Sequence, residues 1–134
     1  MKNFIIKEFV PPEIWEVESE KSLNHIDARI LESIEQIRTH FGSPVIINNW
    51  CYGGQFKYRG YRPAECTIGA AKSLHRSGRA LDFDVVGLAA QDVRAEILKN
   101  EKKFPHIKRM ETGVNWVHID LRGTGQERIM LFNP

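Results

Sequence analysis

The stretch SLHRSGRALDFDV, residues 73–85, decides the fold because a polar turn runs directly into an alternating strand. The apolar side chains of the strand alternate with Asp82 and Asp84, so the two carboxylates share one face. Gly78 allows the bend before the strand. The turn also carries His75, seven residues before Asp82. A histidine and two carboxylates in so short a segment indicate chemistry rather than a plain turn.

A second polar strand is predicted at residues 114–121, where side chains again alternate in character. Trp116, His118 and Asp120 share one face of this strand, and the apolar side chains between them occupy the other. The pattern therefore predicts one face in the core and one polar face.

These two strands predict a metal site if they are neighbours in the sheet. His118 and Asp82 then converge, and the turn brings His75 toward them. Two imidazoles and one carboxylate are the ligand set of a catalytic zinc, which keeps one position open for water. Such a metal lowers the pKa of water to about 7 and polarises a carbonyl, so that an amide can be attacked. The alternative is ordinary surface or core histidines, with Asp82 capping the turn.

The remaining elements predict an α+β fold. An amphipathic helix begins near Ser22 and is stopped by Gly42 and Pro44. Its apolar face consists of Ile26, Ile30, Ile34, Ile37 and Phe41. Together with the two strands already described, at 80–86 and 114–121, strands are expected at residues 45–49, 107–111 and 128–132. A second helix is expected at residues 89–100. We expect one domain over residues 1–134, with a mostly antiparallel sheet and helices packed on one side.

Composition narrows the possible partners and location. The 134 residues include 19 Lys and Arg against 17 Asp and Glu, and the net charge of +2 does not favour binding to nucleic acid. No apolar run is long enough to span a bilayer, and the N-terminus lacks the pattern of a signal peptide. We expect a monomer that is synthesised in the cytoplasm.

A loop of some twenty residues rich in Gly, Arg and Tyr follows the strand at 45–49, and a loop of this length is usually functional. Cys51 and Cys66 flank it and could form a disulfide, but the lack of an export signal favours free thiols. Its aromatic residues, which could stack on substrate or fill the core, are Trp50, Tyr52, Phe56, Tyr58 and Tyr61. We expect burial for Trp50 and Tyr61.

Three motifs resemble those of a known family. SxHxxGxAxD at residues 73–82 and WVHID at 116–120 resemble the zinc D-alanyl-D-alanine peptidases of bacterial cell-wall metabolism. RGYRP at 59–63 resembles the S-G-Y-R element of the same superfamily. The superfamily includes VanX-type dipeptidases, wall carboxypeptidases and phage endolysins, and it shares its fold with the hedgehog signalling domain. The resemblance covers residues 45–122.

The resemblance implies roles for four residues. His75, Asp82 and His118 match the three zinc ligands. Arg62 matches the arginine that binds substrate, and a guanidinium beside the scissile carbonyl can stabilise the oxyanion. The alternative for Arg62 is an exposed charge on the loop.

The sequence departs from the family at Asn115. VanX-type members carry a glutamate three residues before the last histidine, where it acts as the general base, and an amide cannot accept that proton. We expect Glu111 to replace it, because some superfamily members place their glutamate further back. The alternative is an ion pair of Glu111 with Arg109 or Arg122.

Four more residues are candidates around the site. Asp120 is expected to orient an imidazole, and Asp84 could do the same from the neighbouring strand. Ser73 either hydrogen-bonds near the metal or caps the turn. Trp116 lies on the ligand face and is a candidate for contact with substrate.

The resemblance implies a zinc metallopeptidase that cuts peptidoglycan stem peptides at or near a D-alanine. It further implies a phage or prophage endolysin-like protein that reaches the wall after a partner opens the membrane. The rival hypothesis is a non-catalytic zinc-binding domain in which Asn115 marks lost catalysis.

Overall fold

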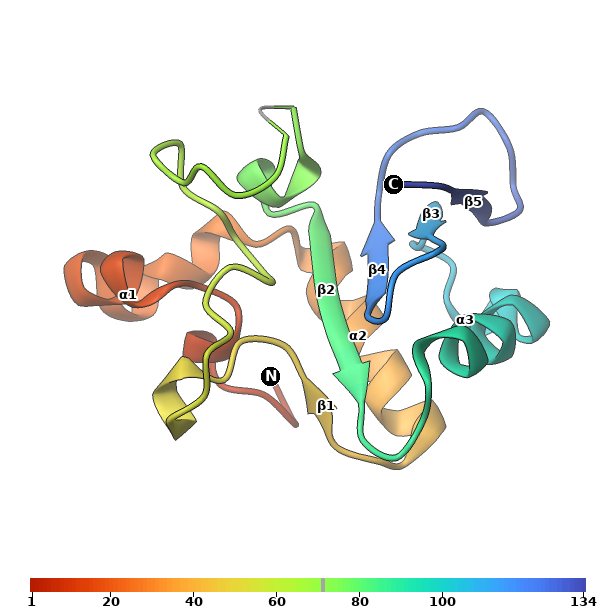
Figure 1. Cartoon of the computed structure of the whole chain (residues 1–134), viewed down its shortest axis with the longest axis horizontal. Coiled ribbons are helices and arrows are strands. Elements are labelled where there is room, and N and C mark those ends of the chain that lie inside the picture. The colour runs from red at the N-terminus through yellow and green to blue at the C-terminus, as the bar shows by residue number, and fades with distance from the viewer. Residues whose placement is uncertain (71) are drawn as a thin grey trace.

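A computed structural model describes residues 1–70 and 72–134, and it is built around one mixed sheet (Figure 1). The strands, in spatial order, are β1 (Val45–Ile46), β2 (Ala80–Val85), β4 (Val117–Asp120), β3 (Arg109–Glu111) and β5 (Met130–Phe132). Neighbouring strands are antiparallel except for β3 and β5, which are parallel. The prediction of an α+β fold with a mostly antiparallel sheet is confirmed.

The long helix α2 (Ala28–Phe41) begins later than its apolar pattern predicts. The side chain of Asp27 accepts a hydrogen bond from the backbone N–H of Arg29 and caps the helix at this point. The preceding segment instead forms a 3₁₀ helix, η2 (Ser19–His25). Gly42 ends α2 in the left-handed conformation, at φ 63°.

The apolar face of the sheet packs against α2 and against α3 (Ala90–Lys99). Leu81 and Phe83 of β2 and Val117 and Ile119 of β4 are fully buried, as strand alternation predicts. They form one core with the buried isoleucines of α2 and with Val93 and Ile97 of α3. Because the apolar side chains point to the helices, the polar side chains of β2 and β4 point to the opposite face.

Several boundaries differ from the prediction. The strands expected at 45–49 and 114–121 are shorter in the structure, and Trp116 lies just before β4 instead of within it. The connection from β3 to β4 therefore spans residues 112–116 and is not a two-residue turn, with Gly113 at φ 76°. A helix that periodicity did not predict, α1 (Pro12–Glu18), begins at a proline in its first turn.

None of the helices in the described part of the chain combines the length and apolar character that crossing a bilayer requires.

Candidate metal centre

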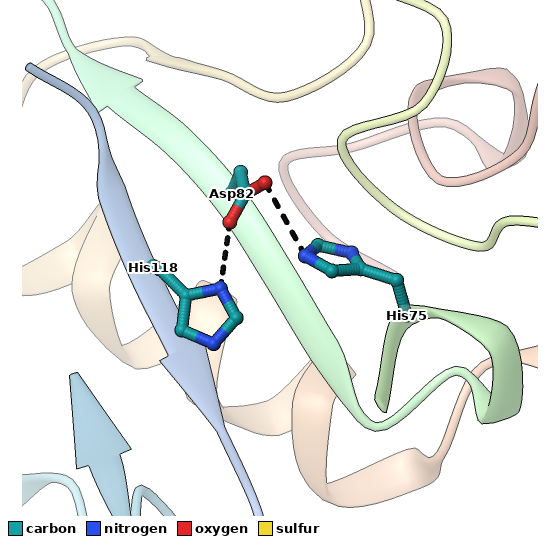
Figure 2. A group of neighbouring side chains, drawn as sticks. All are labelled: His75, Asp82 and His118. Carbon is teal, nitrogen blue, oxygen red and sulfur yellow. Dashed lines mark hydrogen bonds and ion pairs between the residues drawn. The ribbon is translucent and has the colours of Figure 1, made fainter. Parts of the chain in front are cut away.

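Three side chains converge on the polar face of the sheet. Asp82 of β2 lies directly opposite His118 of β4 in the strand register. His75 reaches the same point from a 3₁₀ turn, η4 (Leu74–Ser77), which precedes β2. The Asp82 Oδ1 atom is 2.8 Å from His118 Nδ1, and Oδ2 is 3.2 Å from His75 Nε2. Figure 2 shows the three side chains pointing toward one another. One potential ligand atom from each residue lies within 4.8 Å of the others, and all three residues are buried.

Hydrogen bonds on the far side of each ring fix the orientation of the two imidazoles. His75 Nδ1 donates to the carbonyl oxygen of Gly60 at 2.9 Å, because that oxygen can only accept. His118 Nε2 lies 2.8 Å from Asp120 Oδ2. These contacts leave His75 Nε2 and His118 Nδ1 directed at Asp82. An outer carbonyl or carboxylate on each histidine is typical of zinc-binding imidazoles, so the residues present fit the metal.

The turn that carries His75 depends on two local features. Ser73 caps η4, because its hydroxyl accepts a hydrogen bond from the His75 N–H at 3.3 Å. Gly78 then reverses the chain at φ 68°, and a Cβ atom there would collide with the backbone carbonyl of His25. Of the two roles considered for Ser73, the structure shows the cap, although Ser73 also lines the cavity described below.

The RGYRP segment is tied by its backbone to two of the three residues. Arg62 N–H donates to the His75 carbonyl at 3.0 Å, and Asp82 N–H donates to the Arg59 carbonyl at 2.8 Å. The RGYRP segment, which is distant in sequence from the two strands, therefore packs directly against the centre.

Charge coupling within the cluster shifts three pKa values. Burial favours the neutral form of Asp82, yet hydrogen bonds from His118 and His75 hold its pKa well below the usual range. Burial likewise opposes ionisation of Asp120, but hydrogen bonds from His118 and Arg109 lower its pKa to about 2. For His118, burial disfavours the charged form, and the hydrogen bonds to Asp120 and Asp82 outweigh it and raise the pKa to about 9. In the metal-free protein His118 is therefore an imidazolium held between two carboxylates.

Arg62 points into the centre and is not an exposed loop charge. Its Nη2 atom is 3.2 Å from Asp82 Oδ2, and its Nε donates to the Tyr58 carbonyl at 2.8 Å. Burial is the main influence on this guanidinium and lowers its pKa, which Asp82 partly offsets. Gly69 allows the approach, because a Cβ atom at that position would overlap the Nη1 atom of Arg62.

The polar face opens into a cavity of about 490 Å³, lined by all three converging residues and by Arg62. Glu111 and Trp116 also line it. The register of β3 and β4 pairs Met110 with Ile119, so Glu111 takes the next position beside His118. Within residues 1–70 and 72–134, Glu111 forms no ion pair, which removes the alternative of a partner in Arg109 or Arg122.

The two aspartates proposed to orient an imidazole differ in position. Asp120 contacts His118 directly and is itself held by Arg109, whose Nη2 donates to Oδ2 at 2.7 Å. Asp84 contacts neither histidine, because its carboxylate accepts from Arg59 Nη1 at 2.9 Å and lies opposite Ile46 of β1. The expectation that Asp84 orients an imidazole therefore finds no contact to support it. Asp84 shares the polar face of β2 with Asp82, but β4 begins at Val117, opposite Phe83, so no residue of β4 pairs with Asp84.

Sequence reasoning missed the contributions of Arg109 and Phe132. Arg109 pins Asp120 and stacks on the Phe132 ring at 3.9 Å, and Phe132 contacts the His118 ring at a centroid distance of 5.6 Å. The available signal was that Arg109 and Glu111 alternate onto one face of the predicted strand at 107–111. The parallel pairing of β5 with β3 could not be read from that pattern.

Cys51 and Cys66 are free thiols in the structure, as expected.

The aromatic residues of the long loop that follows β1 divide between the surface and the core. Tyr52 is 66% exposed, whereas Tyr61 packs against the core and stacks on the His25 ring. Trp50 is half-buried, and its Nε1 donates to the Val10 carbonyl.

Comparison with known proteins found a family model that matches most of the chain. The model described as Peptidase M15 matches residues 7–120, which include every residue of the centre. The chain belongs to the Peptidase M15 family. This is the zinc-dependent family of D-Ala-D-Ala carboxypeptidases and VanX-type enzymes, so the resemblance drawn from the motifs is confirmed. No curated protein and no solved structure matched the chain. Membership of Peptidase M15 implies hydrolysis of a peptide.

Proposed function

We propose that this protein is a zinc metallopeptidase that hydrolyses amide bonds of peptidoglycan stem peptides at or near a D-alanine. The observation that carries the proposal is the convergence of His75, Asp82 and His118 beside a cavity. The nitrogen of each imidazole that faces away from Asp82 is already hydrogen-bonded to an oxygen of the protein. His75 Nε2, His118 Nδ1 and the Asp82 carboxylate would hold the metal. Bound zinc in such a site supplies a nucleophilic water near neutral pH and polarises the scissile carbonyl.

Glu111 and Arg62 take the remaining chemical roles in this proposal. Glu111 is a carboxylate in the cavity without an ion-pair partner among the described residues, so it is free to accept a proton and return it to the leaving amine. Asn115 is exposed and does not line the cavity, and so cannot substitute for it. Arg62 is aimed at the centre, where its guanidinium can stabilise the negative charge that develops on the carbonyl oxygen.

The substrate and setting rest on the family. Family members act on D-alanine peptides of the wall, and the superfamily that the motifs resemble includes phage endolysins, so the proposal extends to an endolysin-like protein of a phage or prophage. A partner that opens the membrane would then release it to the wall.

The test is hydrolysis of purified peptidoglycan, measured as newly released amines, with zinc content determined in parallel. We expect the wild type to hold stoichiometric zinc and release amines, and His118→Ala to lose both properties. Glu111→Gln should keep its zinc but lose activity by roughly 10²-fold or more, as expected for removal of a general base. Glu127→Gln, which changes an exposed carboxylate outside the cavity, is the matched control.

A second candidate function is a non-catalytic zinc-binding domain, favoured by the amide at Asn115. Zinc-loaded wild type that releases no amine would establish this candidate and overturn the peptidase proposal. If Glu111→Gln cuts as fast as the wild type, only the role of Glu111 is lost.

A further inference from the structure

The cavity beside the centre carries more cationic than anionic side chains. Among the described residues that line it, the Lys and Arg side chains are Arg62, Lys72, Arg109 and Arg122. The carboxylates are those of Asp82, Glu111 and Asp120. A divalent metal would add two further positive charges, so the occupied cavity favours an anionic ligand.

Two of the four cations are already committed to carboxylates. Arg62 pairs with Asp82 at 3.2 Å, and Arg109 pairs with Asp120 at 2.7 Å. The ring of Phe132 also covers the guanidinium of Arg109. Lys72 and Arg122 differ, because within residues 1–70 and 72–134 neither forms an ion pair, and both are exposed on the rim of the cavity.

The side chain of Arg122 is tied to the backbone of Lys72, and the backbone of Arg122 is tied to the centre. Arg122 Nη2 donates to the Lys72 carbonyl at 3.2 Å, joining the segment that leads to His75 with the segment that follows β4. The backbone N–H of Arg122 donates to Asp120 Oδ1 at 3.0 Å. Arg122 is thus anchored to the same carboxylate that orients His118. It also lies beyond residue 120, where the match to the family model ends.

We propose that Lys72 and Arg122 form a carboxylate-binding subsite, which holds a carboxylate of the peptide substrate at the rim of the cavity. This inference rests on the proposed function and names the chemistry by which that site selects its peptide. The guanidinium of Arg122 and the ammonium of Lys72 belong to residues that line the same cavity, and such cations bind a carboxylate through charge-assisted hydrogen bonds. A stem peptide offers two sources of this group, the terminal α-carboxylate and the free carboxylate of an internal D-glutamate.

Hydrolysis of paired peptides distinguishes the two sources. One pair is diacetyl-L-Lys-D-Ala-D-Ala as the free acid and as the C-terminal amide. The other pair contains an internal D-glutamate or the corresponding D-isoglutamine. We expect the wild type to prefer the acid member of one pair by roughly 10- to 100-fold in kcat/KM, the range of a charge-assisted hydrogen bond.

The double variant Lys72→Met/Arg122→Met should lose that preference while cleaving the neutral member about as fast as the wild type does. Arg128→Met is the matched control, since Arg128 is exposed, pairs with Glu101 and lies outside the cavity. The peptide pair for which the double variant no longer prefers the acid member identifies the source of the carboxylate. Equal cleavage of acid and neutral members by the wild type, or a preference that survives in the double variant, would overturn the subsite.

A binding measurement separates this inference from the proposed function. N-acetyl-D-alanine, its amide and N-acetyl-D-glutamine are titrated into zinc-loaded protein and followed by NMR. N-acetyl-D-alanine carries the terminal carboxylate, and N-acetyl-D-glutamine carries the free α-carboxylate of a glutamate whose side chain is in amide linkage. At least one of these two acids should bind the wild type more tightly than the amide of N-acetyl-D-alanine does, whether or not any peptide is cleaved. The double variant should lose this difference and keep its zinc. If no such difference exists in the wild type, the subsite is wrong even for an active peptidase.

Discussion

The Nε2 atom of His118 lies 2.8 Å from the Oδ2 atom of Asp120, two residues further along the same strand. Side chains two residues apart share a face of a strand, which makes this contact local. Arg109 on the neighbouring strand then holds the carboxylate by three contacts of 3.2 Å or less. The result is a chain of contacts from the partly buried Arg109 of β3 to the centre, which fixes the nitrogen of His118 that faces Asp82.

Asp120→Asn should weaken zinc binding by roughly 10- to 100-fold, because an amide oxygen is a poorer acceptor for the imidazole and for Arg109. Competition with a chromogenic chelator measures the affinity. Asp84→Asn is the control, since Asp84 is on the same face of β2 but pairs with Arg59 outside the cavity. Equal affinities for Asp120→Asn and the wild type would contradict the orienting role of Asp120.

Zinc affinity should rise with pH up to about 9. Hydrogen bonds to Asp120 and Asp82 raise the pKa of His118 to about 9 in the metal-free protein, so zinc must displace a proton from this ring at pH 7. Below the raised pKa, deprotonation of His118 should increase the zinc affinity about tenfold per pH unit. Above that pKa, this increase should level off. Calorimetry in buffers of different ionisation enthalpy should detect at least about one proton released per zinc at pH 7. No proton release would contradict a charged His118.

Gly78→Ala should destabilise the fold more than Gly42→Ala. Both glycines have φ near 65°, so each substitution carries a similar backbone strain of about 1–2 kcal/mol. A Cβ atom at Gly78 also collides with the His25 backbone, whereas nothing lies within 4 Å of one at Gly42. Urea unfolding measures both. Equal losses in the free energy of unfolding would show that the turn before β2 adjusts without cost.

Gly69→Ala should lower kcat/KM and leave zinc affinity unchanged. A Cβ atom at Gly69 overlaps the guanidinium of Arg62, and a displaced Arg62 cannot stabilise the oxyanion, an effect of up to roughly 10²-fold. Gly125→Ala is the control, with a similar φ of 73° and open space around the added atom. A Gly69→Ala enzyme as active as Gly125→Ala would argue that Arg62 is not positioned by this close approach.

Local periodicity carried much of the prediction. Alternation along β2 and β4 placed Asp82, His118 and Asp120 on one polar face, and helical spacing found the buried face of α2. Boundaries were less predictable, because a single cap at Asp27 starts α2 later than the apolar pattern does.

The sequence by itself determined which residues share a face, since the period of a strand or helix is a property of the backbone. Only the tertiary structure decided which faces meet. Strand register set His118 opposite Asp82 and left Asp84 to Arg59, and the parallel pairing of β5 brought Phe132 onto Arg109. The Arg122 side chain and the Lys72 backbone are fifty positions apart along the chain and meet because β2 pairs with β4 between them. Register and strand order depend on packing over the whole core, which no local stretch of sequence contains.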